Sequence, residues 1–149
     1  MLRGWRISEW MGLDGNGGLF VAGRWHSLGQ RVLYVGEHPA LALVESMAHM
    51  RLSLSAIPLT LKLIAVDIKD GASMSPTPAL PPGWQANEVT SRAIGDAWLQ
   101  SNSGLVLPVP SAIIAHARNY IINPGYRQAS THLKEAMVEP IWIDPRFLR

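Results

Sequence analysis

The sequence predicts an α+β fold. Segments with the periodicity of strands and segments with the periodicity of helices are interspersed along the chain, but they do not follow the strict strand–helix–strand rhythm of a doubly wound sheet. Hydrophobic residues make up 48% of the 149 positions and charged residues 16%, which provides for one substantial core and is unlike a disordered chain. Neither an internal repeat nor a linker divides the sequence, so we expect residues 1–149 to form a single domain.

Two short strands and a helix are expected in the first third of the chain. Residues 5–7 alternate between apolar and polar, residues 32–35 form an apolar run, and both patterns indicate strands. The glycine-rich segment 12–18 predicts a loop, because it lacks the third glycine and the following crossover of a dinucleotide-binding fingerprint. Apolar residues at helical spacing then predict a helix over 36–52, with Pro39 in its first turn.

The middle of the chain adds two strands and a second helix. Residues 59–68 and 105–109 have strand patterns. The segment 71–83 is rich in Pro, Ser and Gly and is expected to be a long loop. A helix is expected over 90–100, with Thr90 as its N-cap.

The last third of the chain is patterned less clearly. Residues 111–123 are apolar with either period, so a strand and a helix both stay open there. The dipeptide Asn123-Pro124 marks a turn at the end of that segment. We expect a final short strand over 141–143.

Composition argues against several classes of function. The chain has no cysteine, so disulfides, Cys-ligated zinc and a thiol nucleophile are excluded. The net charge is only +2 and no basic run occurs, which argues against direct nucleic-acid binding. No apolar run reaches the length of a membrane span and no secretory leader pattern is visible at the N-terminus. We therefore expect a cytoplasmic protein that does not associate with membranes.

Histidine and serine spacings do not support a metal site or a serine hydrolase. The five histidines form no i, i+4 pair and no His-Glu-x-x-His motif, so no metal site is expected. They are His26, His38, His49, His116 and His132. The chain has no Gly-x-Ser-x-Gly motif, and Ser111 after its proline is most simply a turn or cap serine.

Glu45 is unusual because it lies in an apolar stripe of the expected helix. The residues three and four positions away are Leu41, Ala42, Ala48 and His49. A carboxylate in such a stripe faces a core, a cleft or an interface, and burial there requires compensating partners. The alternative is a glutamate at the edge of the face, loosely paired with His49.

Two arginines are candidates for binding an anion. Arg24 follows Gly23, where the backbone can bend closely around a ligand, and its guanidinium can bind a phosphate through two hydrogen bonds. The alternative is a surface arginine stacked on Trp25 or Trp5. The same choice applies to Arg6 on the first expected strand.

Six segments together resemble the RES-domain family, which comprises toxins of toxin–antitoxin pairs. The order and spacing of these segments match along nearly the whole chain. They are WRI at 5–7, GRWHSLGQRVLYVGEHPALALVE at 23–45, IGDAWL at 94–99, VLPVPSAI at 106–113, RNYIINP at 118–124 and IDPRFL at 143–148.

The resemblance places the Arg, Glu and Ser that give the family its name at Arg24, Glu45 and Ser111. It adds Tyr34 to this catalytic set. The residues it implies for NAD binding are Arg6, Arg24, Tyr34, Ser111 and Asn119. The chain departs from many members at His26, where they carry asparagine, so the role of that position stays open.

The resemblance also implies a fold, an activity and a partner. The fold is like that of ADP-ribosyltransferases, with two small, largely antiparallel sheets around an NAD cleft and flanking helices. The activity is degradation of NAD+ as a substrate, by phosphorolysis with inorganic phosphate or by hydrolysis. The partner is an Xre-type helix-turn-helix antitoxin that blocks the cleft and forms a hetero-oligomer with the toxin.

The residue types suit cleavage of the nicotinamide–ribose bond, which passes through a cation-like ribose. The Glu45 carboxylate would stabilise that charge most where water is excluded. Arg24 and Arg6 would bind the pyrophosphate. Tyr34 would stack on the nicotinamide or bond the ribose, and Ser111 would hold Glu45 or a ribose hydroxyl.

Two other functions use the same cleft. One is ADP-ribosylation of a protein, and the other is NAD binding without catalysis. Many transferases carry a second acidic residue two positions before the catalytic glutamate. Leu43 occupies that position here, which favours a small-molecule acceptor.

Overall fold

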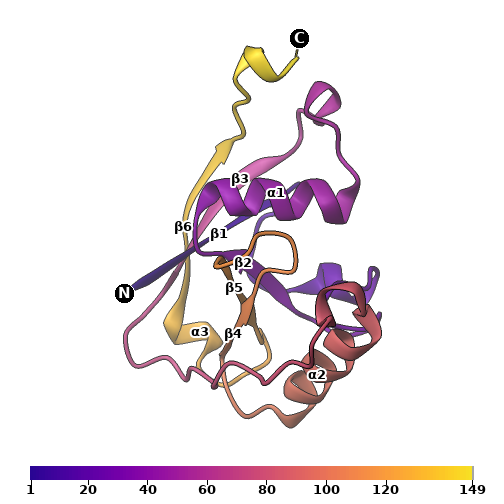
Figure 1. The fold of residues 1–149 in the computed structure, drawn as a ribbon. Coiled ribbons are helices and arrows are strands. Elements are labelled where there is room, and N and C mark those ends of the chain that lie inside the picture. Colours follow the sequence, from indigo (N-terminus) through magenta and orange to yellow (C-terminus); the bar gives the residue numbers. More distant parts are fainter. Residues whose placement is uncertain (149) are drawn as a thin grey trace.

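The computed structural model describes residues 1–148, which form one six-stranded antiparallel sheet with two longer helices packed against it (Figure 1). The strands are β1 (Leu2–Ser8), β2 (Leu33–Gly36), β3 (Lys62–Ile68), β4 (Val106–Pro110), β5 (Arg118–Ile122) and β6 (Leu133–Pro140). The helices are α1 (Pro39–Met50), α2 (Glu88–Ser101) and the short α3 (Ala129–His132). The predicted α+β class is confirmed.

The sheet consists of two three-stranded halves joined at one point. The strand order is β4-β5-β2-β1-β3-β6, and every neighbouring pair is antiparallel. β1 pairs with β3 along its whole length, but it pairs with β2 only through Trp5 and Gly36. The expectation of two small sheets is therefore corrected. The Trp5–Gly36 pair joins the two halves into one sheet.

The helices cover different parts of the sheet. α1 packs on β1 and β2, where Ala42 joins a cluster with Ile7 and Leu61. α2 packs near β4 and β5, where Leu99 joins a cluster that contains Trp25 and Ile121 (Figure 1). α1 therefore lies across the junction of the two halves, whereas α2 lies beside the half formed by β4, β5 and β2.

The observed ends of both long helices differ from the predicted ones. The helix predicted over 36–52 is shorter, and Pro39 does occupy its first turn. The predicted N-cap Thr90 is wrong. α2 begins earlier, and the Asn87 side chain accepts a hydrogen bond from the Thr90 N–H at 3.3 Å. Asn87 and Thr90 are both residue types that cap helices, and local preference did not distinguish them.

The last third differs most from the prediction. Of the ambiguous segment 111–123, residues 118–122 form a strand, and the residues before them form a loop. The final strand predicted over 141–143 is wrong, since the last strand is β6 and ends at Pro140. β6 is an edge strand that pairs only with β3 and is largely half-buried or exposed, so it lacks a strong apolar alternation.

Across residues 1–148, no helix has both the length and the apolar character that crossing a lipid bilayer requires.

Candidate active site

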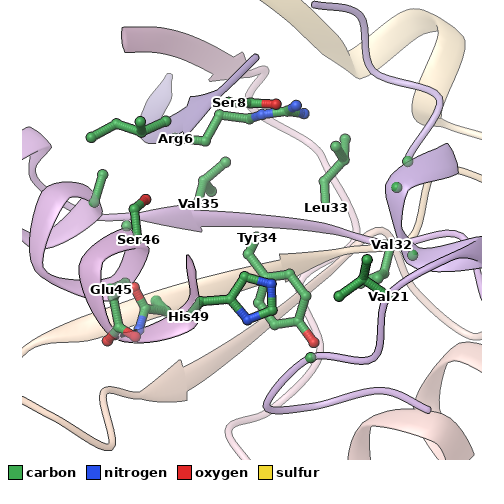
Figure 2. Close-up of a pocket in the computed structure, with 18 of the residues that line it drawn as sticks. Arg6, Ser8, Val21, Val32, Leu33, Tyr34, Val35, Glu45, Ser46 and His49 are labelled. Atoms are coloured by element: carbon green, nitrogen blue, oxygen red, sulfur yellow. Dashed lines mark hydrogen bonds between the residues drawn. The ribbon is translucent and has the colours of Figure 1, made fainter. Parts of the chain in front are cut away.

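A cleft of about 400 Å³ lies between the two halves of the sheet (Figure 2). It opens where β1 and β2 diverge beyond their single pair, and α1 and the loop after β1 complete its walls. Five of the predicted site residues line it, namely Arg6, Arg24, Tyr34, Glu45 and Asn119. Ser111 contacts one of these residues from behind the cleft wall. The fold thus brings together residues that are far apart in the sequence.

Glu45 is held in place by two donors from distant strands. Its Oε1 atom accepts a hydrogen bond from Ser111 Oγ at 2.6 Å and another from Asn119 Nδ2 at 2.9 Å. Ser111 is buried, and its Oγ in turn accepts the N–H groups of Ile113 and Ile114 at 3.1 and 3.0 Å. Ser111 is therefore a turn serine, as its local sequence indicated, and also orients the carboxylate.

The second carboxylate oxygen of Glu45 is available to the cleft. Within residues 1–148, no hydrogen bond from a protein group reaches Oε2. The buried face of α1 consists of Leu41, Ala42 and Ser46, so Glu45 lies at its border with the cleft. His49 lines the cleft one turn further along α1, and Figure 2 shows both side chains on the same side of the helix. The arrangement offers a negative charge of fixed position to a ligand.

Tyr34, which is half-buried on β2, and the buried His26 form a hydrogen-bonded pair in the cleft lining. The Tyr34 hydroxyl accepts the Trp25 N–H at 3.0 Å and lies 2.6 Å from His26 Nδ1. Because His26 Nε2 lies 2.9 Å from the Val21 carbonyl oxygen, Nε2 carries the proton and Tyr34 donates to Nδ1. His26, whose role the sequence left open, thus fixes both the Tyr34 hydroxyl and the loop that carries Trp25. Burial lowers the pKa of His26 and raises the pKa of Tyr34, so both are neutral near pH 7.

We expect His26 to make the protein less stable in mild acid. Its pKa is lowered in the folded state, so below about pH 6.5 the unfolded chain binds a proton that the folded chain does not. The contribution of His26 to the free energy of unfolding is fully present above about pH 6.5. It falls as the pH drops toward the folded-state pKa of His26, by at most about 1.4 kcal/mol per pH unit. Urea unfolding between pH 7.5 and 5.5 should show a smaller loss for His26→Asn than for the wild type.

His116→Asn is the matched control, since His116 is exposed and has a positive φ that asparagine tolerates. Its pH dependence should equal that of the wild type. An identical pH dependence in His26→Asn would contradict the assignment of His26 as a buried neutral histidine.

Arg24 connects the cleft wall to the segment before α2. Its Nη2 donates to the carbonyl oxygens of Trp84 and Gln85 at 2.9 and 2.5 Å, and its guanidinium lies 5.5 Å from the Trp84 ring centroid. The aromatic ring beside Arg24 is therefore that of Trp84. The alternative interpretation of the sequence had named Trp25 or Trp5. Its Nη1 lies 3.7 Å from Glu88, and its Nε is buried without a partner among the described residues. Arg24 lines the cleft, and at the same time it anchors the 84–88 segment.

Arg6 holds the loop that follows β1. Its guanidinium donates to the Trp10 carbonyl oxygen at 3.0 Å and to the Gly12 carbonyl oxygen at 3.4 Å. The Gly12 N–H donates to Glu135 of β6 at 2.7 Å. Burial lowers the pKa of Arg6, while the charges of Glu135 and Asp14 oppose that shift. The loop therefore borders the cleft in a fixed position.

α2 fastens the 23–30 segment from outside the cleft, a role that the sequence did not reveal. Polar side chains of α2 bond backbone groups of that segment. The bonds join Ser91 Oγ to Arg24 O at 2.6 Å, Arg92 Nε to Gly23 O at 2.8 Å and Ser27 N to Asp96 Oδ1 at 2.8 Å. The one hint of this role in the sequence was the IGDAWL motif, which contains Asp96. A motif alone does not say which residues its side chains contact.

Comparison with known proteins identifies relatives of the whole chain. The RES domain family model matches residues 3–144. A protein named Toxin Res from Pseudomonas putida is 40% identical, over 85% of this chain and 88% of its own length. A protein named Prs ADP-ribosylating toxin from a Sphingobium species is 31% identical, over 97% of this chain and 96% of its own. A Toxin Res from Yersinia enterocolitica is 28% identical, over 98% of this chain and 95% of its own.

Proposed function

Since the chain belongs to the RES domain family, we propose that it is a toxin that cleaves the nicotinamide–ribose bond of NAD+. The observation that carries the proposal is the Glu45 carboxylate in the cleft, with one oxygen held by Ser111 and Asn119 and the other open to a ligand. NAD+ is the substrate here rather than a cofactor. Loss of NAD+ would arrest growth of the cell that makes the toxin.

In the proposed reaction, the bond between the ribose C1″ and the nicotinamide nitrogen breaks, and its electron pair leaves with neutral nicotinamide. The ribose becomes cation-like, and the Glu45 carboxylate stabilises that charge. The carboxylate is already oriented by Ser111 and Asn119, so little reorganisation is needed as the charge develops. Nicotinamide leaves without protonation, and the site therefore requires no general acid.

The acceptor completes the reaction on the ribose. An oxygen of inorganic phosphate bonds C1″ in phosphorolysis and gives ADP-ribose-1″-phosphate. Water bonds C1″ in hydrolysis, releases a proton to solvent and gives ADP-ribose. The positive charges of Arg24 and Arg6, both at the cleft, favour the pyrophosphate of the substrate and an incoming phosphate. Tyr34 borders the same space and would contact the nicotinamide or its ribose.

A second candidate is ADP-ribosylation of a protein. It is favoured by the Sphingobium relative, which is named an ADP-ribosylating toxin. The first step is the same in both candidates, and they differ only in the acceptor. Many transferases that modify proteins have an acidic residue two positions before the catalytic glutamate. This chain has Leu43 at that position, which favours a small-molecule acceptor over a protein.

A toxin of this kind requires a partner that keeps it inactive. We propose an Xre-type helix-turn-helix antitoxin that covers the cleft in a hetero-oligomer, in the cytoplasm where NAD+ is abundant. Phe20 and Val21 support a protein contact near the cleft, because they are apolar side chains that are 75% and 55% exposed. The chain itself, with a net charge of +2, would contact neither DNA nor membrane.

The proposal is tested by incubating the purified chain, freed of any partner, with NAD+ in the presence and absence of inorganic phosphate. We expect nicotinamide to appear with ADP-ribose-1″-phosphate, with ADP-ribose, or with both, and chromatography separates these products. Label from NAD+ that appears on protein instead would support the second candidate. NAD+ that binds in a calorimetric titration but stays intact under every condition would contradict catalysis.

A further inference from the structure

Trp10 is an aromatic side chain at the cleft that the proposed chemistry does not use. It lines the cleft, yet its side chain is 75% exposed. An exposed indole at a cleft offers a flat, rigid apolar surface on which a planar ring can stack. Trp142 is comparably exposed, at 74%, but does not border the cleft.

The backbone of Trp10 is fixed on both sides, so its indole is presented by an ordered loop. The Trp10 N–H donates to Ser8 Oγ at 3.0 Å. The Trp10 carbonyl oxygen accepts from the guanidinium of the half-buried Arg6 at 3.0 Å. The Gly12 bond to Glu135 fixes the loop again two residues later. An arginine at the cleft wall thus orients this loop by bonding its carbonyl groups.

Trp10 and the two donors that hold Glu45 belong to opposite halves of the sheet. The Glu45 carboxylate is bound to Ser111 and Asn119, which lie after β4 and within β5. The loop of Trp10 follows β1 and is bound to β6. A dinucleotide has a ring at each end, and the ring that leaves must lie at Glu45. The other ring then needs a second surface of the same cleft, and Trp10 lines the cleft from the other half of the sheet.

We propose that the Trp10 indole is the stacking surface for the adenine of NAD+, with Arg6 as the residue that positions it. The identity of the ligand rests on the proposed function. Stacking of a base on an aromatic side chain changes affinity by about 5- to 150-fold. Trp10 would therefore favour dinucleotides over mononucleotides. It has no role in breaking the bond.

The test compares Trp10→Ala and Trp10→Phe on NAD+ and on nicotinamide mononucleotide, which has the bond to be broken but no adenine. Trp10→Ala should raise the KM for NAD+ about tenfold and change kcat less than twofold. Its kinetics on nicotinamide mononucleotide should equal those of the wild type. Trp10→Phe should recover most of the lost affinity, since phenylalanine retains a flat ring. Trp142→Ala is the matched control and should change nothing.

Binding of ADP-ribose, measured by calorimetry, separates this inference from the proposed function. Weaker binding to Trp10→Ala than to the wild type supports the stacking role even if the wild type does not cleave NAD+. Equal binding of ADP-ribose to Trp10→Ala and to the wild type would overturn it, whether or not NAD+ is cleaved. An equal rise of KM for nicotinamide mononucleotide would also overturn it, because the indole would then not contact adenine. In that case the Trp10 indole would serve a contact other than adenine, such as one with a protein partner.

Discussion

Replacement of Glu45 by glutamine is expected to reduce NAD+ cleavage by about 100- to 1,000-fold and to leave the fold intact. The glutamine carbonyl oxygen can take the place of Oε1 and accept from Ser111 and Asn119, which donate at 2.6 and 2.9 Å. The local structure is thereby preserved while the negative charge is lost. Without that charge, the cation-like ribose is no longer stabilised.

The measurement is the rate of nicotinamide release at saturating NAD+, accompanied by circular dichroism and a thermal unfolding curve. Glu139→Gln is the matched control, because Glu139 is an exposed carboxylate on the edge strand β6. It should have wild-type activity. If Glu45→Gln folds, binds ADP-ribose and cleaves NAD+ at the wild-type rate, the carboxylate has no catalytic role.

Replacement of Gly95 by alanine is expected to destabilise the protein by about 3 kcal/mol or more. In the interior of a helix this change normally stabilises, by about 1 kcal/mol, so its sign is diagnostic. Gly95 lies on α2 against the backbone of Trp25, and a Cβ there would overlap the Trp25 carbonyl oxygen. Trp25 cannot move freely, since it is buried and its N–H donates to the Tyr34 hydroxyl.

Urea or thermal unfolding measures this effect, with Gly17→Ala as the control. Gly17 has open space around its Cα, so the same substitution there should stay within about 0.5 kcal/mol of the wild type. Gly95→Ala should also lose NAD+ cleavage. The added methyl group would push away the loop that contains Trp25, and the same loop carries Arg24. A Gly95→Ala protein that is as stable as the wild type would show that α2 does not fix this loop.

Part of the proposed site could be predicted from local sequence. Glu45 was visible because a charged residue interrupted an apolar stripe at helical spacing, and the helix does border a cleft there. Its partners could not be found that way, since Ser111 and Asn119 lie 66 and 74 residues further along the chain. The pairings of β4 with β5 and of β5 with β2 bring them to α1.

Side-chain partners were the least predictable part of the site. His26 is buried beside Tyr34, yet its sequence context is equally compatible with a surface position. Arg24 binds the carbonyl groups of Trp84 and Gln85, which are 60 and 61 residues away. Such bonds depend on how α2 packs, and no periodic pattern encodes them. The strand β6 was missed for a related reason, because an edge strand does not require apolar residues on both faces.

The order of strands in the sheet also determines when the protein can become active during its synthesis. Glu45 is translated in the first third of the chain, but the strand that carries Asn119 lies between β2 and β4 and is made much later. β3 likewise lacks its second neighbour until β6 has left the ribosome. Long-range pairings of this kind form late and slowly in folding. A nascent chain therefore carries the Glu45 carboxylate without the two donors that orient it until Ser111 and Asn119 have been made and β5 has paired with β2.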